Sequence, residues 1–477
     1  MAFGLRISKE MLVQGSCFAL AFFVFNVSES VYTLRAAALL DAAAVSPFLA
    51  TMFVSFGAGL LSFPALRRVF TDDAGRENVA IFFGCILIAS TFVSALTFGV
   101  GAFVLFACFS MICAGHLFAA ASYSFAMTFS GQGLLGRALG ISMFVASLLQ
   151  YAVQWSDALL SAAFLVSVVL MVASLMVLLL RQSWRWSLDD PAPVLAAVAI
   201  RHRGALVAAV AAMAMVYASV EGILSTPVLG GVVNMPNEAH VVFAASVLAA
   251  GIIHDAREGR YTVIAALCAL IMSMCCVAFI SVSALADVAA LILSGCAGFY
   301  VLFLTAPFMA IAPHTASPEL WASVGLVARV FVSAPLMLLA PWSYGDGDSI
   351  ALLVVCCTAA AVSMVVLLPG MVSLMAATEA AGEDGAGASG AAGGVPIASR
   401  EDVALEWAQA LGLTPRETEV LVPLVATELG VQDIADSLYI SRRVAQRHIA
   451  AIYEKAQVSS RIGLFQALED YRLSGIR

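Results

Sequence analysis

The chain has 477 residues, of which 62% are hydrophobic and 11% are charged, and its formal net charge is −8. Soluble proteins carry about 25% charged residues, so this composition excludes an ordinary soluble globular protein and indicates a membrane protein. The acidic total does not exclude nucleic-acid binding, because affinity for DNA comes from the local charges that face phosphate.

Apolar stretches long enough to cross a bilayer, at about 20 residues each, recur along most of the chain. The eighth is short, and the third and fourth nearly run together, so the count of twelve has eleven and thirteen as alternatives. The twelve occupy residues 11–34, 44–66, 79–97, 99–123, 136–158, 160–180, 205–227, 238–253, 261–282, 285–311, 318–340 and 350–376. The sequence therefore predicts an all-α, polytopic helix bundle over residues 1–376, which we interpret as a sensor.

Positive charges between the spans predict the orientation of this bundle. If the N-terminus is inside, only Arg35 lies on the outer side. The inner side then collects Arg6, Lys9, Arg67, Arg68, Arg76, Arg137, Arg181, Arg185, Arg201, Arg203, Arg257 and Arg260. An even number of spans returns the C-terminus to the cytoplasm, so we expect a multi-pass protein of the cell (inner) membrane with both termini cytoplasmic.

The longest polar loop between spans, Arg181 to Gly204, divides them six and six. Glu29 in the first span and Glu221 in the seventh occupy corresponding places in the two halves. The run from Gly251 to Arg260 loosely matches the transporter loop pattern G-x-x-x-D-R-x-G-R. This organisation resembles the major facilitator superfamily, whose members are built from two six-helix halves. The resemblance implies a transporter-like fold, but active transport cannot be carried over from it.

Ionisable side chains inside the spans are costly to bury in lipid, and each is therefore a candidate for a functional role. We expect a pocket for an unknown small ligand, lined by Asn26, Glu29, Gln150, Glu221 and Arg329. The alternative is a structural Glu–Arg pair that holds helices together. His116 in the fourth span could join the pocket, but a hydrogen bond between helices is the more ordinary role for such a histidine.

The sequence contains no motif that favours an enzyme. Two G-x-G-x-x-G strings, Gly131 to Gly136 and Gly385 to Gly390, do not follow a strand of a βαβ unit, so they do not predict nucleotide binding. All ten cysteines lie in apolar runs and are not accompanied by other metal-ligating residues. This pattern predicts neither a disulfide framework nor a metal site. We expect no catalytic residue and no cofactor.

Residues 377–398 are rich in glycine and alanine and predict a flexible linker to a polar C-terminal domain, residues 399–477. A short amphipathic helix is expected from Ser399, with Val403, Trp407 and Leu411 on the side that packs against the rest of that domain.

The next helices of this domain follow from local patterns. Thr414-Pro415-Arg416-Glu417 combines a capping hydroxyl, an early proline and a glutamate three residues after the cap, which predicts a helix start. A second short helix is expected over 431–438, with Ile434, Ala435 and Leu438 facing inward. Ser441 should cap a third helix whose inward positions are Ala445, either His448 or Ile449, and Ile452. This order predicts a helix-turn-helix.

These residues resemble the LuxR-type DNA-binding domain. The matches run through Leu413-Thr414-Pro415-Arg416-Glu417-Thr418-Glu419-Val420-Leu421, Ile434-Ala435, Leu438, Ile440-Ser441, His448, Ile452-Tyr453-Glu454-Lys455 and Val458-Ser459-Ser460-Arg461. Gln446 stands where the family has a lysine, and Arg447 could restore that charge to a phosphate. The resemblance implies a four-helix domain that acts as a homodimer through its last helix, about 460–473.

We expect double-stranded DNA to be bound by the cationic and polar side chains of the third helix and the segment after it. These are Arg442, Arg443, Gln446, Arg447, His448, Lys455 and Arg461. The alternative is that the arginines form only the solvated face of a surface helix.

Taken together, the sequence predicts a membrane-embedded one-component transcription regulator, in which a transporter-like bundle senses a signal and the C-terminal domain binds promoter DNA. One alternative is a secondary transporter of the major facilitator type with a regulatory C-terminal domain. Another is a degenerate helix-turn-helix, given Val444, Ala445 and Gln446, that no longer binds DNA.

Overall fold

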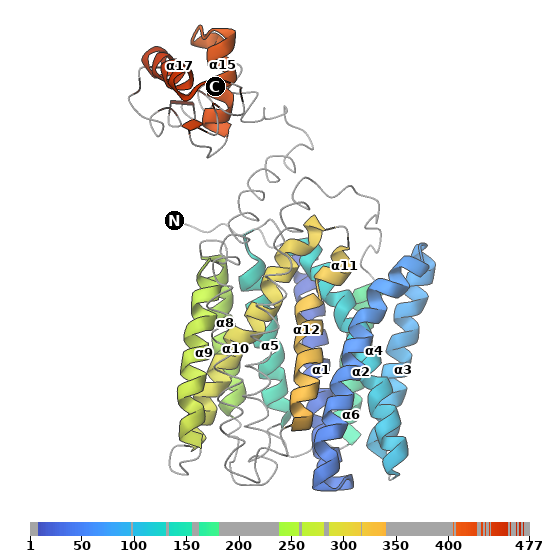
Figure 1. Cartoon of the computed structure of the whole chain (residues 1–477). Helices are drawn as coiled ribbons and strands as arrows, with labels where there is room; N and C mark the ends of the chain where they lie inside the picture. The colour runs from blue at the N-terminus through green and yellow to red at the C-terminus, as the bar shows by residue number, and fades with distance from the viewer. Residues whose placement is uncertain are drawn as a thin grey trace. The chain divides into compact units, whose positions relative to one another are not determined.

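In the computed structural model, the chain forms two compact units, residues 1–383 and 384–477 (Figure 1). The structure describes residues 8–96, 99–129, 133–154, 162–180, 238–256, 260–280, 286–315, 317–339, 407–426 and 440–456, with scattered residues between 404 and 471. The linker expected at 377–398 lies outside this set.

The first unit is a bundle of long helices. In the N-terminal half these are α1 (Lys9–Leu39), α2 (Ala42–Val69), α3 (Asp73–Leu96), α4 (Val100–Phe129), α5 (Leu135–Gln154) and α6 (Ala162–Leu180). In the C-terminal half they are α8 (Glu238–Asp255), α9 (Arg260–Ile280), α10 (Ala286–Ile311), the short α11 (Pro318–Trp321) and α12 (Val324–Leu339). A short 3₁₀ turn, Ala312–His314, follows α10.

Ten of the twelve expected spans coincide with these helices, and the other two, 205–227 and 350–376, lie outside the described residues. Within the described part of the chain, seven helices are long and apolar enough to cross a membrane. The stretch 318–340 is divided between α11 and α12, with a turn at Ala322 and Ser323 between them. The apolar pattern continues through this turn, and so hydropathy alone does not reveal it.

Glycine allows several of these helices to approach closely. A Cβ atom on Gly59 of α2 would overlap the carbonyl oxygen of Ile112 on α4, and one on Gly115 would overlap the carbonyl oxygen of Phe56. Phenylalanine rings of α1, α2 and α4 fill the adjoining core, with the ring centroids of Phe25 and Phe56 4.3 Å apart. Contact between small residues is a usual way to join helices where lipid offers no hydrophobic driving force.

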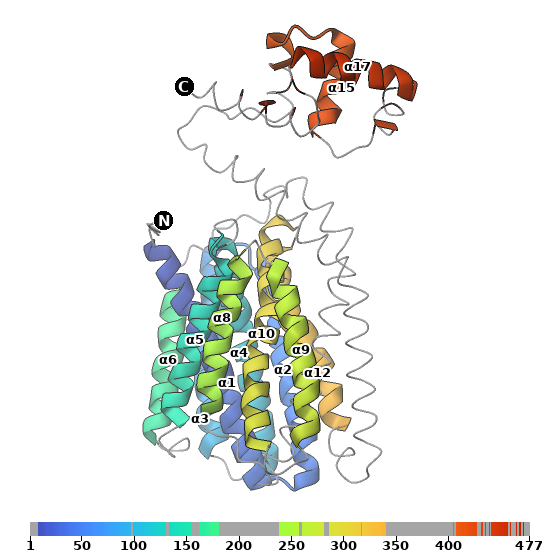
Figure 2. The same cartoon turned by 90° about the vertical axis from the view of Figure 1, so that its left-hand side faces the viewer.

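The two halves of the bundle meet along α5 and α8, which lie side by side in both views (Figure 2). Gly136 and Gly140 of α5 face Gly251 of α8, and a Cβ on Gly140 would lie 3.0 Å from the carbonyl oxygen of Val247. The run around Gly251, which loosely matched a transporter loop pattern, thus forms a close contact between the halves.

The second unit contains α15 (Pro415–Ala426) and α17 (Arg442–Lys455). Its apolar core joins Leu421 and Leu424 of α15 to Ile449 and Ile452 of α17. Trp407 is buried in the same core, as expected for the amphipathic segment that begins near Ser399, and Leu411 packs against it. Leu464 and Leu468, from the segment expected to form the last helix, are buried there too.

Candidate nucleic-acid interface

The first turn of α15 is fixed by a reciprocal pair of hydrogen bonds. The Glu417 backbone N–H donates to Thr414 Oγ1 at 3.3 Å, and the Thr414 backbone N–H donates to Glu417 Oε2 at 2.7 Å. The capping box predicted from the sequence is therefore confirmed. It satisfies two backbone donors that a helix start would otherwise leave without a partner.

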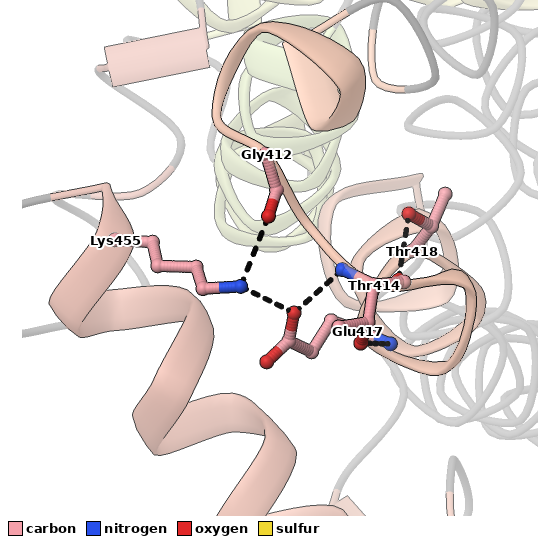
Figure 3. A network of polar contacts seen from close by, with 5 residues as sticks. All are labelled: Gly412, Thr414, Glu417, Thr418 and Lys455. Carbon is pink, nitrogen blue, oxygen red and sulfur yellow. Dashed lines mark hydrogen bonds and ion pairs between the residues drawn. The ribbon is translucent and has the colours of Figure 1, made fainter.

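The same glutamate ties α15 to the end of α17 (Figure 3). Lys455 Nζ lies 2.8 Å from Glu417 Oε2 and donates a second hydrogen bond, 3.0 Å long, to the carbonyl oxygen of Gly412. Gly412 has a φ of +62°, a conformation that L side chains rarely adopt. The hydrogen bond from Lys455, together with that from the Thr414 backbone, lowers the pKa of the Glu417 carboxyl to about 2. The Glu417 carboxyl in this bridge is therefore ionised near neutral pH.

The start of α17 is also capped as predicted. Ser441 Oγ accepts a hydrogen bond from the Val444 backbone N–H at 3.4 Å. Ala445, Ile449 and Ile452 are buried, whereas His448 is half-buried, so Ile449 rather than His448 occupies the inward position. This register fixes which side chains α17 presents to solvent.

The residues predicted to bind DNA are divided among several environments. Exposed side chains at the start of α17 are Arg442, Arg443, Gln446 and Arg447, and His448 lies beside them, half-buried. Lys455 is engaged by the bridge to Glu417, so its position supports the packing of α15 on α17, and its contact with DNA stays a prediction. Arg461 lies outside the described residues.

The candidate ligand pocket of the bundle is brought together only in part. Gln150 of α5 donates a hydrogen bond to Ser30 Oγ of α1 at 3.4 Å, one turn from Asn26, whose carbonyl oxygen accepts from Ser30. The carbonyl oxygen of Glu29 accepts from Thr33 Oγ1 at 2.7 Å. Arg329 is buried on α12, and Glu221 lies outside the described residues. Gln150 thus contacts α1 within one turn of Asn26, and a shared pocket stays a prediction.

His116 forms a hydrogen bond between two helices, which is the more ordinary of the two roles considered for it. Its Nδ1 lies 2.8 Å from Ser62 Oγ of α2, and its ring stacks on Phe83 of α3 with centroids 3.8 Å apart. A small cavity beside it is lined by Arg67 and Arg76 together with apolar side chains.

Two polar contacts between the halves were missed from the sequence. Asp255 at the end of α8 accepts hydrogen bonds from the backbone N–H groups of Gly136 and Arg137, at 2.7 and 2.9 Å, and from Arg137 Nε at 2.8 Å. Arg68 at the end of α2 pairs with Glu319 of α11 at 3.1 Å. The Asp255 side chain is 4% exposed and that of Glu319 is 0%, so both carboxylates are shielded from water.

Both contacts lie at one end of the bundle, because α1 to α5 run in alternating directions and the end of α2 returns to the level at which α5 begins. We call these two contacts the inter-half latch: Asp255 with Arg137, and Glu319 with Arg68. The only sequence signal for it was Asp255 within the loosely matched loop pattern.

Comparison with known proteins supports the predictions made for both units. Residues 411–468 match the family model of bacterial regulatory proteins of the luxR family. No curated protein matches the chain at a significant level. The chain therefore carries a LuxR-type DNA-binding domain in its C-terminal unit.

The membrane unit has a fold similar to that of a solved transporter. The xylose transporter XylE from E. coli, in a partially occluded inward-open conformation, is similar with a TM-score of 0.51 at 14% identity, covering 75% of this chain and 97% of that one. The human organic anion transporter MFSD10 (TM-score 0.47, 14% identity, 77% and 100% covered) and a D-xylose–proton symporter (0.48, 14%, 74% and 96%) are also similar. At these identities the likeness concerns the fold alone.

Proposed function

We propose that the chain is a membrane-embedded one-component transcription regulator, in which the bundle senses a signal and the C-terminal unit binds promoter DNA. The observation that carries the proposal is the exposed arginine surface of α17 within a LuxR-type domain, on the same chain as a transporter-like bundle. The proposal assigns the chain no catalytic step.

The proposal places both termini on the cytoplasmic side of the inner membrane. The support is the asymmetry of arginine and lysine between the predicted loops. A reporter fused after Arg477 tests this placement directly. An extracellular reporter would contradict the proposal, because chromosomal DNA is inside the cell.

The signal in this proposal is a small ligand that the bundle binds unequally in two conformations, since equal binding would shift nothing. A conformational change that separates the two halves at the inter-half latch would cost free energy. It would expose the carboxylates of Asp255 and Glu319 and break both ion pairs. The output is dimerisation, exposure or release of the C-terminal unit. A homodimer would bind two half-sites about one turn of DNA apart.

The test of DNA binding is measurement of the affinity of residues 399–477 for promoter fragments that co-purify with the full chain. We expect affinity to fall steeply with salt, because each phosphate contact releases counterions. The double variant Arg443→Ala/Arg447→Ala should lose most of this affinity. A wild-type fragment without salt-sensitive binding to any duplex would favour the degenerate domain instead.

The second candidate is a secondary transporter whose C-terminal unit regulates it, and the observation in its favour is the transporter fold. Uptake into vesicles that contain the purified chain separates the two candidates. Substrate accumulation that depends on Glu29 and Glu221 would support transport, whereas ligand binding without accumulation supports sensing.

A further inference from the structure

The buried side of α17 defines which of its side chains face outward. Ala445, Ile449 and Ile452 point into the core of the C-terminal unit. At about 100° of rotation per residue, Arg443 and Arg447 lie within roughly 30° of the opposite direction. Two arginines one helical turn apart therefore form the crest of the exposed face.

Among the described residues of the C-terminal unit, these two arginines have no competing partner. In the part of the chain that the structure describes, neither makes a hydrogen bond or an ion pair. Other cations of the same unit do: Arg416 pairs with Glu419 at 2.6 Å, and Lys455 pairs with Glu417. The crest of α17 thus keeps its donors available for an external acceptor.

The chemistry of the crest changes along the helix. Glu454, also exposed, lies about two turns beyond Arg447 on the same side. Its carboxylate would repel phosphate, so the favourable part of the helix for insertion into a groove is its first two turns. Gln446 lies on the flank of the crest rather than at its centre.

The distance between Arg443 and Arg447 along α17 limits which base pairs the two side chains can contact together. Four residues of α-helix rise about 6 Å, and base pairs stack about 3.4 Å apart. A guanidinium presents paired N–H donors that match O6 and N7 of guanine in the major groove, the commonest specific contact of an arginine with DNA. A helix lying along the groove would bring two such contacts to base pairs one or two steps apart.

We propose that Arg443 and Arg447 read guanines in two base pairs no more than two steps apart in each half-site, and that Arg442 contacts the DNA backbone. This inference rests on the proposed function and extends it, because it assigns the sequence preference to two side chains. It also replaces the phosphate contact that the sequence suggested for Arg447 with a base contact.

The test is selection of binding sites from a randomised duplex library by the full chain in lipid nanodiscs, for the wild type and for Arg443→Ala, Arg447→Ala and Arg442→Ala. The wild type should enrich guanines at two nearby positions. Each of the first two variants should lose the preference at one of these positions, by roughly 10- to 100-fold. Arg442→Ala should weaken binding to all sequences alike and leave the preference unchanged.

The outcomes separate this inference from the proposed function. If Arg443→Ala and Arg447→Ala weaken binding uniformly, with the enriched sequence unchanged, the arginines contact phosphate and the inference is overturned, whereas DNA binding stands. If the wild type enriches no sequence and binds no duplex, both fall. All three side chains are exposed, and unchanged far-ultraviolet circular dichroism of the variants would establish that the fold is intact.

Discussion

Lys455 Nζ contacts Glu417 Oε2 across 38 residues of sequence, and this bridge joins the last turn of α17 to the first turn of α15. The same oxygen accepts the Thr414 backbone N–H. One carboxylate therefore serves both the local cap and the packing of two helices, and the orientation of the arginine crest depends on it.

The first prediction concerns the stability of this bridge. Lys455→Met keeps most of the aliphatic stem but leaves Glu417, whose side chain is 10% exposed, without its cation. We expect the free energy of unfolding of residues 399–477 to fall by about 1–2 kcal/mol in urea titrations. Arg416→Ala, which breaks the exposed pair with Glu419, is the matched control and should change it by less than about 0.5 kcal/mol. Equal effects of the two variants would refute a special role for the bridge.

The second prediction is an acid dependence of the same domain. The pKa of Glu417 is lowered to about 2 in the folded state, below the ordinary value of about 4.3. Its contribution is therefore complete above the ordinary value and is lost as the pH falls towards 2. Stability should decline more between about pH 6 and pH 3 in the wild type than in Glu417→Gln, when both are measured by urea unfolding. Parallel declines would show that other carboxyls dominate.

The third prediction concerns the inter-half latch. The amides of Gly136 and Arg137 lie in the first turn of α5, where a helix offers them no carbonyl, and both donate to Asp255. Asp255→Ala should therefore accelerate their hydrogen exchange by about tenfold or more, as measured by mass spectrometry on peptides covering 133–141. Asp287→Ala, at the exposed start of α10, removes an acid without touching the latch and should leave this exchange unchanged.

The fourth prediction concerns the contact between α2 and α4. Gly59→Ala forces its new methyl group into the carbonyl oxygen of Ile112, and overpacking of this kind costs about 1–3 kcal/mol. The midpoint of thermal unfolding in detergent should fall by several degrees. Gly101→Ala is the control, because a Cβ there meets nothing within 4 Å. A midpoint for Gly59→Ala as high as that of the control would mean that the helices can separate without cost.

The sequence was most informative where structure depends on neighbours in the chain. The capping box of Thr414 and Glu417, the Ser441 cap and the buried Ala445 and Ile452 of α17 all follow from residues within one or two turns of each other. The helices of the bundle could be predicted for a similar reason, since a span is defined by its own hydropathy.

Contacts between distant segments could not be predicted in the same way. Asp255 and Arg137 are 118 residues apart, and nothing in either local pattern specifies the register in which α5 packs on α8. The bridge from Lys455 to Glu417 was missed for the same reason, and the predicted contact of this lysine with DNA stays a prediction. The turn between α11 and α12 interrupts a stretch whose hydropathy is continuous.

Carrying the two units on one polypeptide has a geometric consequence for gene control. A repressor or activator that is free in solution can slide and hop along a chromosome, whereas under the proposed function this chain would bind DNA while it is anchored in the bilayer. A target site must therefore travel to the protein, and only loci that visit the cell periphery can be occupied. Under the proposed function, the position of a gene within the nucleoid would influence its response as much as the strength of its operator.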